Sequence, residues 1–218
     1  MITRRDFFGG ATCLTLGIAA LLPVRVLAQV KAPQAGQDFV KLGKLAPIEA
    51  PTGKIEVVEF FWYNCPHCSA FEPVLSEWTK RLPKDVLFRR VPIAFRDDYV
   101  PQQNLYYALE AMGLLETLHT RVFAAIHGER QNLVNAESIT EWVVKQGVDR
   151  AKFVTHFSSF STSTKASRAR QLMNAYQIEG VPALGVAGRF YTDGAMGKGM
   201  EGALRVTDYL IGQVRAKP

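Results

Sequence analysis

Two cysteines separated by a proline and a histidine, Cys65-Pro66-His67-Cys68, constrain the fold of this 218-residue chain more than any other feature. The apolar residues 55–61 precede them and are typical of a buried strand. Proline suits the first position of a helix, because the amide that it lacks would have no partner there. The pattern therefore predicts a buried strand followed by a helix that begins at Pro66, with Cys65 as its N-cap.

The same residues predict a redox site. A cysteine at an N-cap faces unpaired N–H groups and the positive end of the helix dipole, which favour the thiolate form. We therefore expect Cys65 to be acidic and reactive. Cys68 lies one helical turn further along the chain, close enough to form a disulfide with Cys65.

Three other uses of a Cys-x-x-Cys pair fit less well. A static disulfide that closes so short a loop adds little stability. Zinc would need two more ligands, and covalent haem would need a histidine where Ser69 follows the second cysteine. The other histidines lie in predicted helices without zinc-finger spacing, and we interpret them as packing or surface residues: His119, His127 and His156.

Residues 1–28 have the pattern of a bacterial export signal. Arg4 and Arg5 form a charged beginning, an apolar run covers residues 11–22, and small residues precede position 29. The paired arginines favour the twin-arginine route, and Sec export is the alternative. The apolar run is short for a membrane-spanning helix. We therefore expect cleavage after Ala28 and export to an oxidising compartment.

Cleavage would leave Cys65 and Cys68 as the only cysteines, because the third, Cys13, lies in the signal. An exported protein with one such pair has no structural disulfide framework, so its disulfide is expected to be the working one. The net charge is +6, but lysines and arginines are scattered along the chain. No basic stripe with interleaved aromatic residues is visible, so we expect no nucleic-acid partner.

Hydrophobic spacing predicts a sheet interrupted by helices. A short strand at 39–42 and a strand at 86–91 accompany the strand at 55–61, and a hairpin covers 181–192. Four helices fill the middle of the chain, one opened by a capping box at Ser138 and one capped by Asp149. A longer helix is expected from residue 165, and a final one carries residues 203–214.

These motifs together resemble the DsbA family of thiol:disulfide oxidoreductases. The resemblance rests on Glu59-Phe60-Phe61, on the Cys-Pro-His-Cys motif, on the helical middle and on Gly180-Val181-Pro182-Ala183, and it spans residues 39–214. It implies an α/β thioredoxin-like fold with an inserted all-helical domain. The expected division is a signal peptide at 1–28, a thioredoxin-like domain at 29–97 and 165–218, and the helical insert at 98–164.

In the family pattern, Cys65 is similar to the exposed nucleophile and Cys68 to its buried partner. Pro66 and His67 are similar to the dipeptide that tunes the reactivity of the pair. Several relatives have phenylalanine or tyrosine directly before the first cysteine, and Asn64 departs from that pattern. The resemblance implies no cofactor or metal beyond a redox-active Cys65–Cys68 disulfide.

The resemblance also implies roles for residues outside the motif. Pro182 is similar to the proline that is cis and lies against the disulfide, and Val181 to the residue whose backbone binds an extended substrate. Glu59 is similar to a buried acid beneath the cysteines, with Arg90 at the position of its basic partner. Glu59 could serve only as a structural partner of Arg90, or it could relay protons to Cys68.

The favoured function is that of a monomeric periplasmic oxidase. It would donate its disulfide to reduced exported proteins and be reoxidised by a membrane partner of the DsbB type. Two alternatives stay open: a periplasmic reductase or isomerase on the same fold, and a non-catalytic chaperone that binds peptides. Motif and resemblance do not fix the direction of electron flow or the client proteins.

Overall fold

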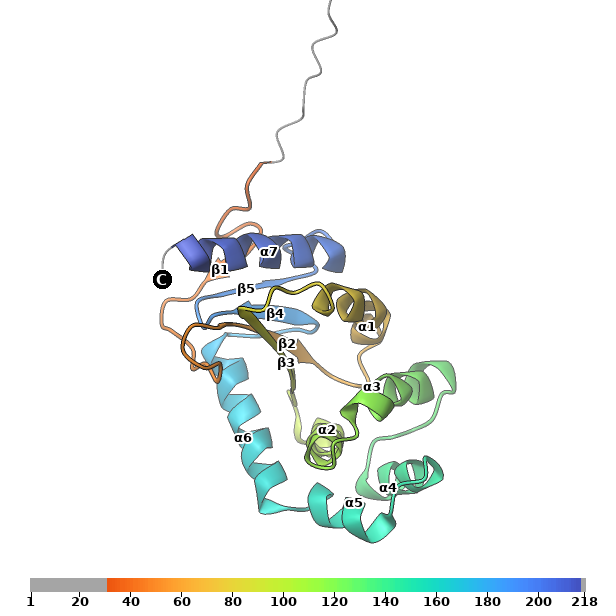
Figure 1. Ribbon diagram of the computed structural model, residues 1–218. Helices are drawn as coiled ribbons and strands as arrows, with labels where there is room; N and C mark the ends of the chain where they lie inside the picture. Colours follow the sequence, from red (N-terminus) through yellow and green to blue (C-terminus); the bar gives the residue numbers. More distant parts are fainter. Residues whose placement is uncertain (1–30, 217–218) are drawn as a thin grey trace, which may run out of the picture. The chain divides into compact units, whose positions relative to one another are not determined.

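Five strands form a single mixed sheet in the order β1-β5-β4-β2-β3 (Figure 1). Strand β2 runs parallel to β3 and antiparallel to β4, while β5 pairs antiparallel with β4 and β1. The predicted hairpin is therefore confirmed. The strands are β1 (Val40–Lys41), β2 (Ile55–Phe61), β3 (Val86–Pro92), β4 (Ala183–Val186) and β5 (Phe190–Asp193).

The computed structural model describes residues 31–216. The chain separates into two units, Met1–Lys31 and Ala32–Pro218, and the sheet with its helices belongs to the second. The predicted export signal at residues 1–28 and Cys13 lie outside the described residues. Within residues 31–216, no helix combines the length and the apolar character needed to cross a bilayer.

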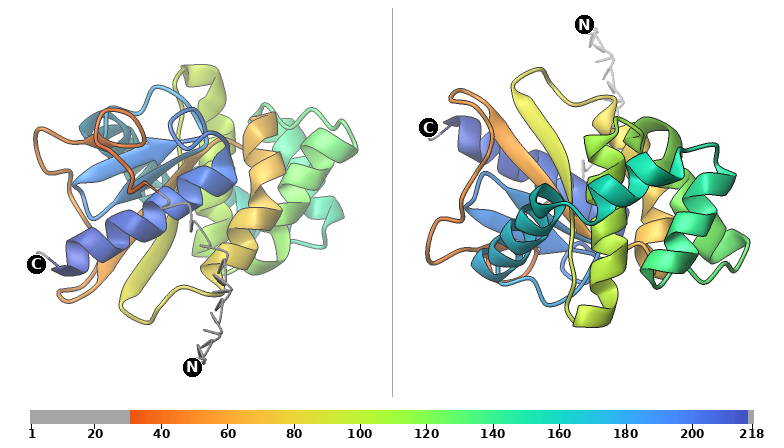
Figure 2. Two further views of the ribbon diagram at one scale, coloured as in Figure 1. Left: turned by 90° about the horizontal axis from the view of Figure 1, so that it is seen from above. Right: turned by 90° about the horizontal axis from the view of Figure 1, so that it is seen from below.

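Helices cover both faces of the sheet. Helices α1 (Pro66–Thr79) and α7 (Met200–Ala216) lie on one face and α6 (Phe160–Ala175) lies on the other (Figures 1 and 2). Because side chains alternate along a strand, β2 supplies both cores. Val57 packs in the cluster with α1 and α7, and Phe60 packs against Tyr176 at the end of α6.

The helices of residues 97–157, between β3 and α6, gather beyond the β3 edge of the sheet (Figure 2). This arrangement confirms a thioredoxin-like fold with a helical insertion. The exact division at residues 97 and 164 stays a prediction, and α6 runs without a break across residues 164 and 165. The inserted helices are η1 (Asp97–Tyr99), α2 (Val100–Ala111), α3 (Leu115–Phe123), the π-helical η2 (Ala124–Gly128), α4 (Ala136–Lys145) and α5 (Arg150–Phe157).

Two predicted helix starts were wrong. Helix α6 begins at Phe160 instead of residue 165, because the Ser159 side chain caps it by accepting a hydrogen bond from the Thr162 amide at 3.1 Å. Helix α4 is capped by Asn135, and Ser138 is the third helical residue of that capping box. The predicted Asp149 cap of α5 is confirmed, since its side chain accepts a hydrogen bond from the Lys152 amide.

Candidate redox site

Strand β2 and helix α1 position the two cysteines as the sequence predicts. All seven residues of β2 are buried, and the chain leaves the strand and enters α1 at Pro66 with Cys65 as the N-cap. Both cysteines are free thiols. Cys65 exposes 7% of its surface and Cys68 none, so Cys65 is the more accessible thiol although it is itself largely buried.

The two thiols have opposite pKa shifts. The hydrogen bond with the Cys68 thiol lowers the pKa of Cys65 most, burial opposes it, and the backbone amides of Cys68 and His67 lower it further, to about 6. Burial and the interaction with Cys65 raise the pKa of Cys68 far above its usual range. The helix N-terminus therefore contributes to the acidity of Cys65 as predicted, but the neighbouring thiol contributes more.

The predicted cis proline lies against the reactive cysteine. The Val181–Pro182 peptide bond is cis, which confirms that expectation. The Cys65 thiol donates a hydrogen bond to the Val181 carbonyl oxygen across 3.5 Å. His67, Val181 and Pro182 line a cavity of about 450 Å³ beside the cysteines. The other residues that line it are Gly180, Asp193, Gly194, Ala195, Gly199 and Met200.

Glu59 and Arg90 face each other across β2 and β3, in the predicted register. Glu59 is 1% exposed, and its Oε2 atom lies 3.1 Å from Arg90 Nε, although neither atom is aligned for a hydrogen bond. Burial raises the pKa of Glu59 to about 8, against the opposing charge of Arg90. The charge of Glu59 in turn raises the pKa of Cys68, so the acid and the buried thiol influence each other.

Sequence reasoning missed three further members of this buried cluster. Glu72 on α1 accepts a hydrogen bond of 2.7 Å from Arg90 Nη2. His119 on α3 lies with its Nε2 atom 3.4 Å from Glu72 Oε2, and its Nδ1 atom is hydrogen-bonded to the Tyr63 hydroxyl at 2.9 Å. His119 was predicted to be a packing or surface residue, and in the structure it is buried and joins the charged cluster.

One sequence signal could have found part of this cluster. Glu72 follows Cys68 by four residues on α1, so both lie on the same face of the helix. His119 carries no comparable signal, because its contact with Glu72 depends on how α3 packs against α1.

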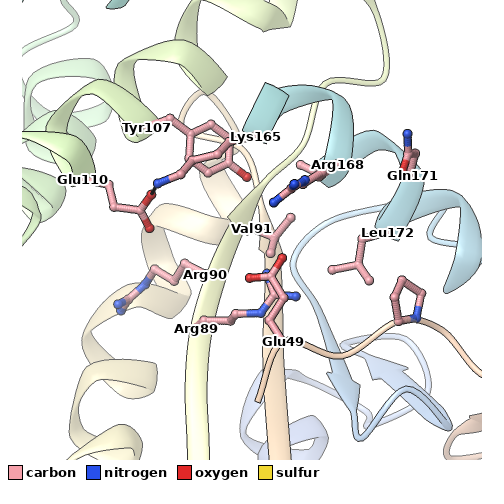
Figure 3. A pocket seen from close by; sticks show the side chains of 12 residues that line it. Glu49, Arg89, Arg90, Val91, Tyr107, Glu110, Lys165, Arg168, Gln171 and Leu172 are labelled. Atoms are coloured by element: carbon pink, nitrogen blue, oxygen red, sulfur yellow. Dashed lines mark hydrogen bonds and ion pairs between the residues drawn. The ribbon is translucent and has the colours of Figure 1, made fainter. Parts of the chain in front are cut away.

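A second cavity, of about 390 Å³, lies between β3 and α6 (Figure 3). Its charged side chains largely pair with one another, as in the 2.6 Å ion pair of Lys165 with Glu110. The Arg90 guanidinium points away from this cavity toward α1, where Glu72 lies (Figure 3). Across residues 31–216, no group of three or more histidine, cysteine or acidic residues is placed to hold a metal ion.

Comparison with known proteins agrees with this geometry. A family model described as a DSBA-like thioredoxin domain matches residues 56–205. The chain belongs to the DsbA family. Among its relatives, a thiol:disulfide interchange protein DsbA of Bordetella parapertussis is 45% identical over 201 residues, covering 92% of this chain and 95% of the relative. The corresponding protein of Burkholderia cepacia is 39% identical over 204 residues, covering 94% and 95%.

Solved DsbA structures have the same fold. The crystal structure of Pseudomonas aeruginosa DsbA superposes with a TM-score of 0.80 at 40% identity, covering 84% of this chain and 95% of that one. DsbA from Xylella fastidiosa gives a TM-score of 0.79 at 34% identity, covering 85% and 100%. As a DsbA-family member the chain is a thiol:disulfide oxidoreductase.

Proposed function

We propose that this chain oxidises cysteine pairs of exported proteins in the periplasm by donating a Cys65–Cys68 disulfide. The observation that carries the proposal is the pair of opposite thiol pKa shifts, with Cys65 lowered to about 6 and Cys68 raised. A thiol of low pKa is a good leaving group, and its stable thiolate favours the dithiol form. The disulfide form is then a strong oxidant.

The reaction proceeds in two exchanges. A substrate thiolate attacks Cys65 Sγ, the Cys65–Cys68 bond breaks, and Cys68 leaves with the electron pair and takes up a proton. The second substrate thiolate then attacks the substrate sulfur of the mixed disulfide and releases Cys65 as a thiolate. Two electrons pass from the substrate to the protein, which ends as the dithiol.

The residues around the cysteines support these steps. Pro66 starts the helix, and the His67 side chain contributes to the low pKa of Cys65 through its charge. The backbone of Val181 and the ring of Pro182 offer an extended substrate a surface at the cavity beside Cys65. Glu59 serves as the proton donor to the departing Cys68 thiolate, because a carboxyl with a pKa of about 8 is mostly protonated at neutral pH.

We also propose how the protein is exported and how its disulfide is restored. Residues 1–28 direct export and are removed, and the mature chain acts as a monomer. A membrane partner of the DsbB type accepts two electrons from the dithiol and restores the disulfide. The thioredoxin-like part at 29–97 and 165–218 carries the chemistry, and the helical part at 98–164 packs beside it.

Equilibration of the mature protein with mixtures of reduced and oxidised glutathione tests the direction of electron flow. We expect a reduction potential well above the value of about −270 mV that is typical of thioredoxin. A thioredoxin-like potential would instead identify a reductase. A Cys65→Ser variant that retained the protein's full effect on unfolded clients would identify a peptide-binding chaperone.

A further inference from the structure

Two histidines, on α3 and η2, are hydrogen-bonded to Tyr63 in the turn before Cys65. His119 Nδ1 on α3 is hydrogen-bonded to the Tyr63 hydroxyl at 2.9 Å, and His127 Nε2 on η2 donates to the Tyr63 carbonyl oxygen at 2.8 Å. Phe123 lies between the two histidines on the same helical face and packs edge-on against the Tyr63 ring at 5.1 Å. Tyr63 is two residues from Cys65, so these contacts reach the redox site directly.

Of these two histidines, His119 also lies beside a charged group. His119 Nε2 lies 3.4 Å from Glu72 Oε2, and both side chains are buried. The Tyr63 hydroxyl stays protonated, because burial raises its pKa well above the usual range. When that hydroxyl donates to Nδ1, a neutral His119 carries its proton on Nε2. This N–H group then lies close to Glu72 Oε2, although the two atoms are not aligned for a hydrogen bond.

Glu72 connects His119 to the acid beneath the cysteines. Its Oε1 atom accepts a hydrogen bond from Arg90 Nη2 at 2.7 Å, and Arg90 Nε lies 3.1 Å from Glu59 Oε2. Arg90 is therefore shared between two buried carboxyl groups. Any change that weakens the attraction of Arg90 to Glu72 would let Arg90 interact more strongly with Glu59.

We propose that His119 and Tyr63 are positioning residues that keep the Glu59 carboxyl protonated for its exchange with Cys68. They hold Glu72 in its ionised form. The Glu72 carboxylate then attracts Arg90 away from Glu59, and its negative charge disfavours a second negative charge on Glu59. Both effects favour the protonated form of Glu59. The inference rests on the proposed function, in which Glu59 is the proton donor.

The groups around His119 agree with this assignment. Burial lowers the pKa of His119 and keeps it neutral, with opposing contributions from Glu72 and from Glu116 on its own helix. Burial works against ionisation of Glu72, but the close contact with His119 and the charge of Arg90 outweigh it and lower the pKa of Glu72. Tyr106 on α2 completes the surroundings, with its ring centroid 5.9 Å from that of His119.

The test is the pH profile of disulfide reduction. The oxidised protein is mixed with a small thiol, and the rate is divided by the concentration of thiolate at each pH. In the parent, the rate should fall as Glu59 loses its proton, and the Glu59 pKa should be visible in a carboxyl NMR titration. His119→Phe should move both midpoints to lower pH. A shift of one unit would lower the protonated fraction about fivefold at the parent's midpoint.

Matched variants separate this effect from a general disturbance. His127→Phe removes a histidine from the same face that touches the same tyrosine, and it should leave both midpoints unchanged. His119→Gln restores a side-chain N–H donor and should recover part of the shift. Tyr63→Phe deletes a single oxygen and should shift the midpoints in the same direction as His119→Phe, which keeps the test informative if His119→Phe does not fold.

The outcomes distinguish the inference from the function on which it rests. If Glu59→Gln keeps the alkaline fall of the rate, then Glu59 is not the proton donor and the proposed role fails. If Glu59→Gln abolishes that fall but His119→Phe and Tyr63→Phe leave the midpoints in place, then the positioning role is wrong while the function stands. An equal shift in His127→Phe would also overturn the positioning role.

Discussion

Two glutamates on strand β2, Glu56 and Glu59, are equally buried beside an arginine, but they differ in their hydrogen bonds. Glu56 is 0% exposed and Glu59 is 1% exposed, and each has an arginine of β3 beside it. Glu56 accepts two hydrogen bonds from Arg89 and a third from the Glu49 amide. The Glu59 Oε2 atom has only a 3.1 Å contact with Arg90 Nε, which is not aligned for a hydrogen bond. Equal burial therefore produces one fully satisfied acid and one that holds a proton.

The difference follows from the faces of the strand. Residues 56 and 59 are an odd number of positions apart, so their side chains lie on opposite faces of the sheet. The Glu56 face meets a loop that supplies a backbone amide from residue 49. The Glu59 face meets α1, which contributes Glu72, a second acid that competes for Arg90. Hydrogen bonding, and not depth, thus distinguishes the fully paired acid from the acid whose pKa is raised.

The largest expected effect is on the pH dependence of stability. Folded Glu59 has a pKa of about 8 against an ordinary 4.5, so between these values unfolding releases a proton and becomes easier as pH rises. Glu59→Gln removes this loss. As pH rises, the free energy of unfolding of Glu59→Gln should exceed that of the reduced parent by a growing amount. The difference should increase by up to about 1.4 kcal/mol per pH unit and level off above pH 8. Urea unfolding at several pH values measures the difference, and a flat difference would contradict the account.

A smaller effect of opposite sign is expected at the other acid. Glu56→Gln replaces a carboxylate that accepts charge-assisted hydrogen bonds from Arg89, so it should lower the free energy of unfolding at neutral pH by about 2 kcal/mol. Urea unfolding compares it with Glu59→Gln, which should not be destabilised at that pH. Equal losses in the two variants would remove the distinction between the acids.

The smallest effect sharpens the same comparison. Glu49 also pairs with Arg89, at 3.7 Å, but its side chain is 62% exposed. Because exposed ion pairs contribute little, Glu49→Gln should change the free energy of unfolding by less than about 1 kcal/mol. A loss as large as that of Glu56→Gln, measured in the same urea series, would show that burial of the Arg89 partner is unimportant.

Local signals predicted the core of the site. Strand β2 has the predicted bounds, and Pro66 starts α1 with Cys65 as its N-cap, because each depends on a few adjacent residues. The family resemblance, and not a local signal, placed Arg90 opposite Glu59, and that register is confirmed. The family resemblance added the cis bond before Pro182, which no local pattern of this chain predicts.

The missed features depend on packing between distant segments. Helix α6 is too polar at its start to show an apolar period, so only the Ser159 cap marks its beginning at Phe160. The His119 contact with Glu72 joins residues that are far apart in the chain and meet only when α3 packs on α1. The leading contribution of the Cys68 thiol to the acidity of Cys65 likewise depends on three-dimensional contact.

A titration of the Cys65 thiolate tests the central claim most directly. Ultraviolet thiolate absorbance and the rate of alkylation, followed against pH in the reduced protein, should give a pKa of about 6 for Cys65. In Cys68→Ala the pKa should rise, because the hydrogen bond that lowers it most is lost while burial, which raises it, remains. A Cys65 that titrates near 9 in the unmodified protein would contradict the account.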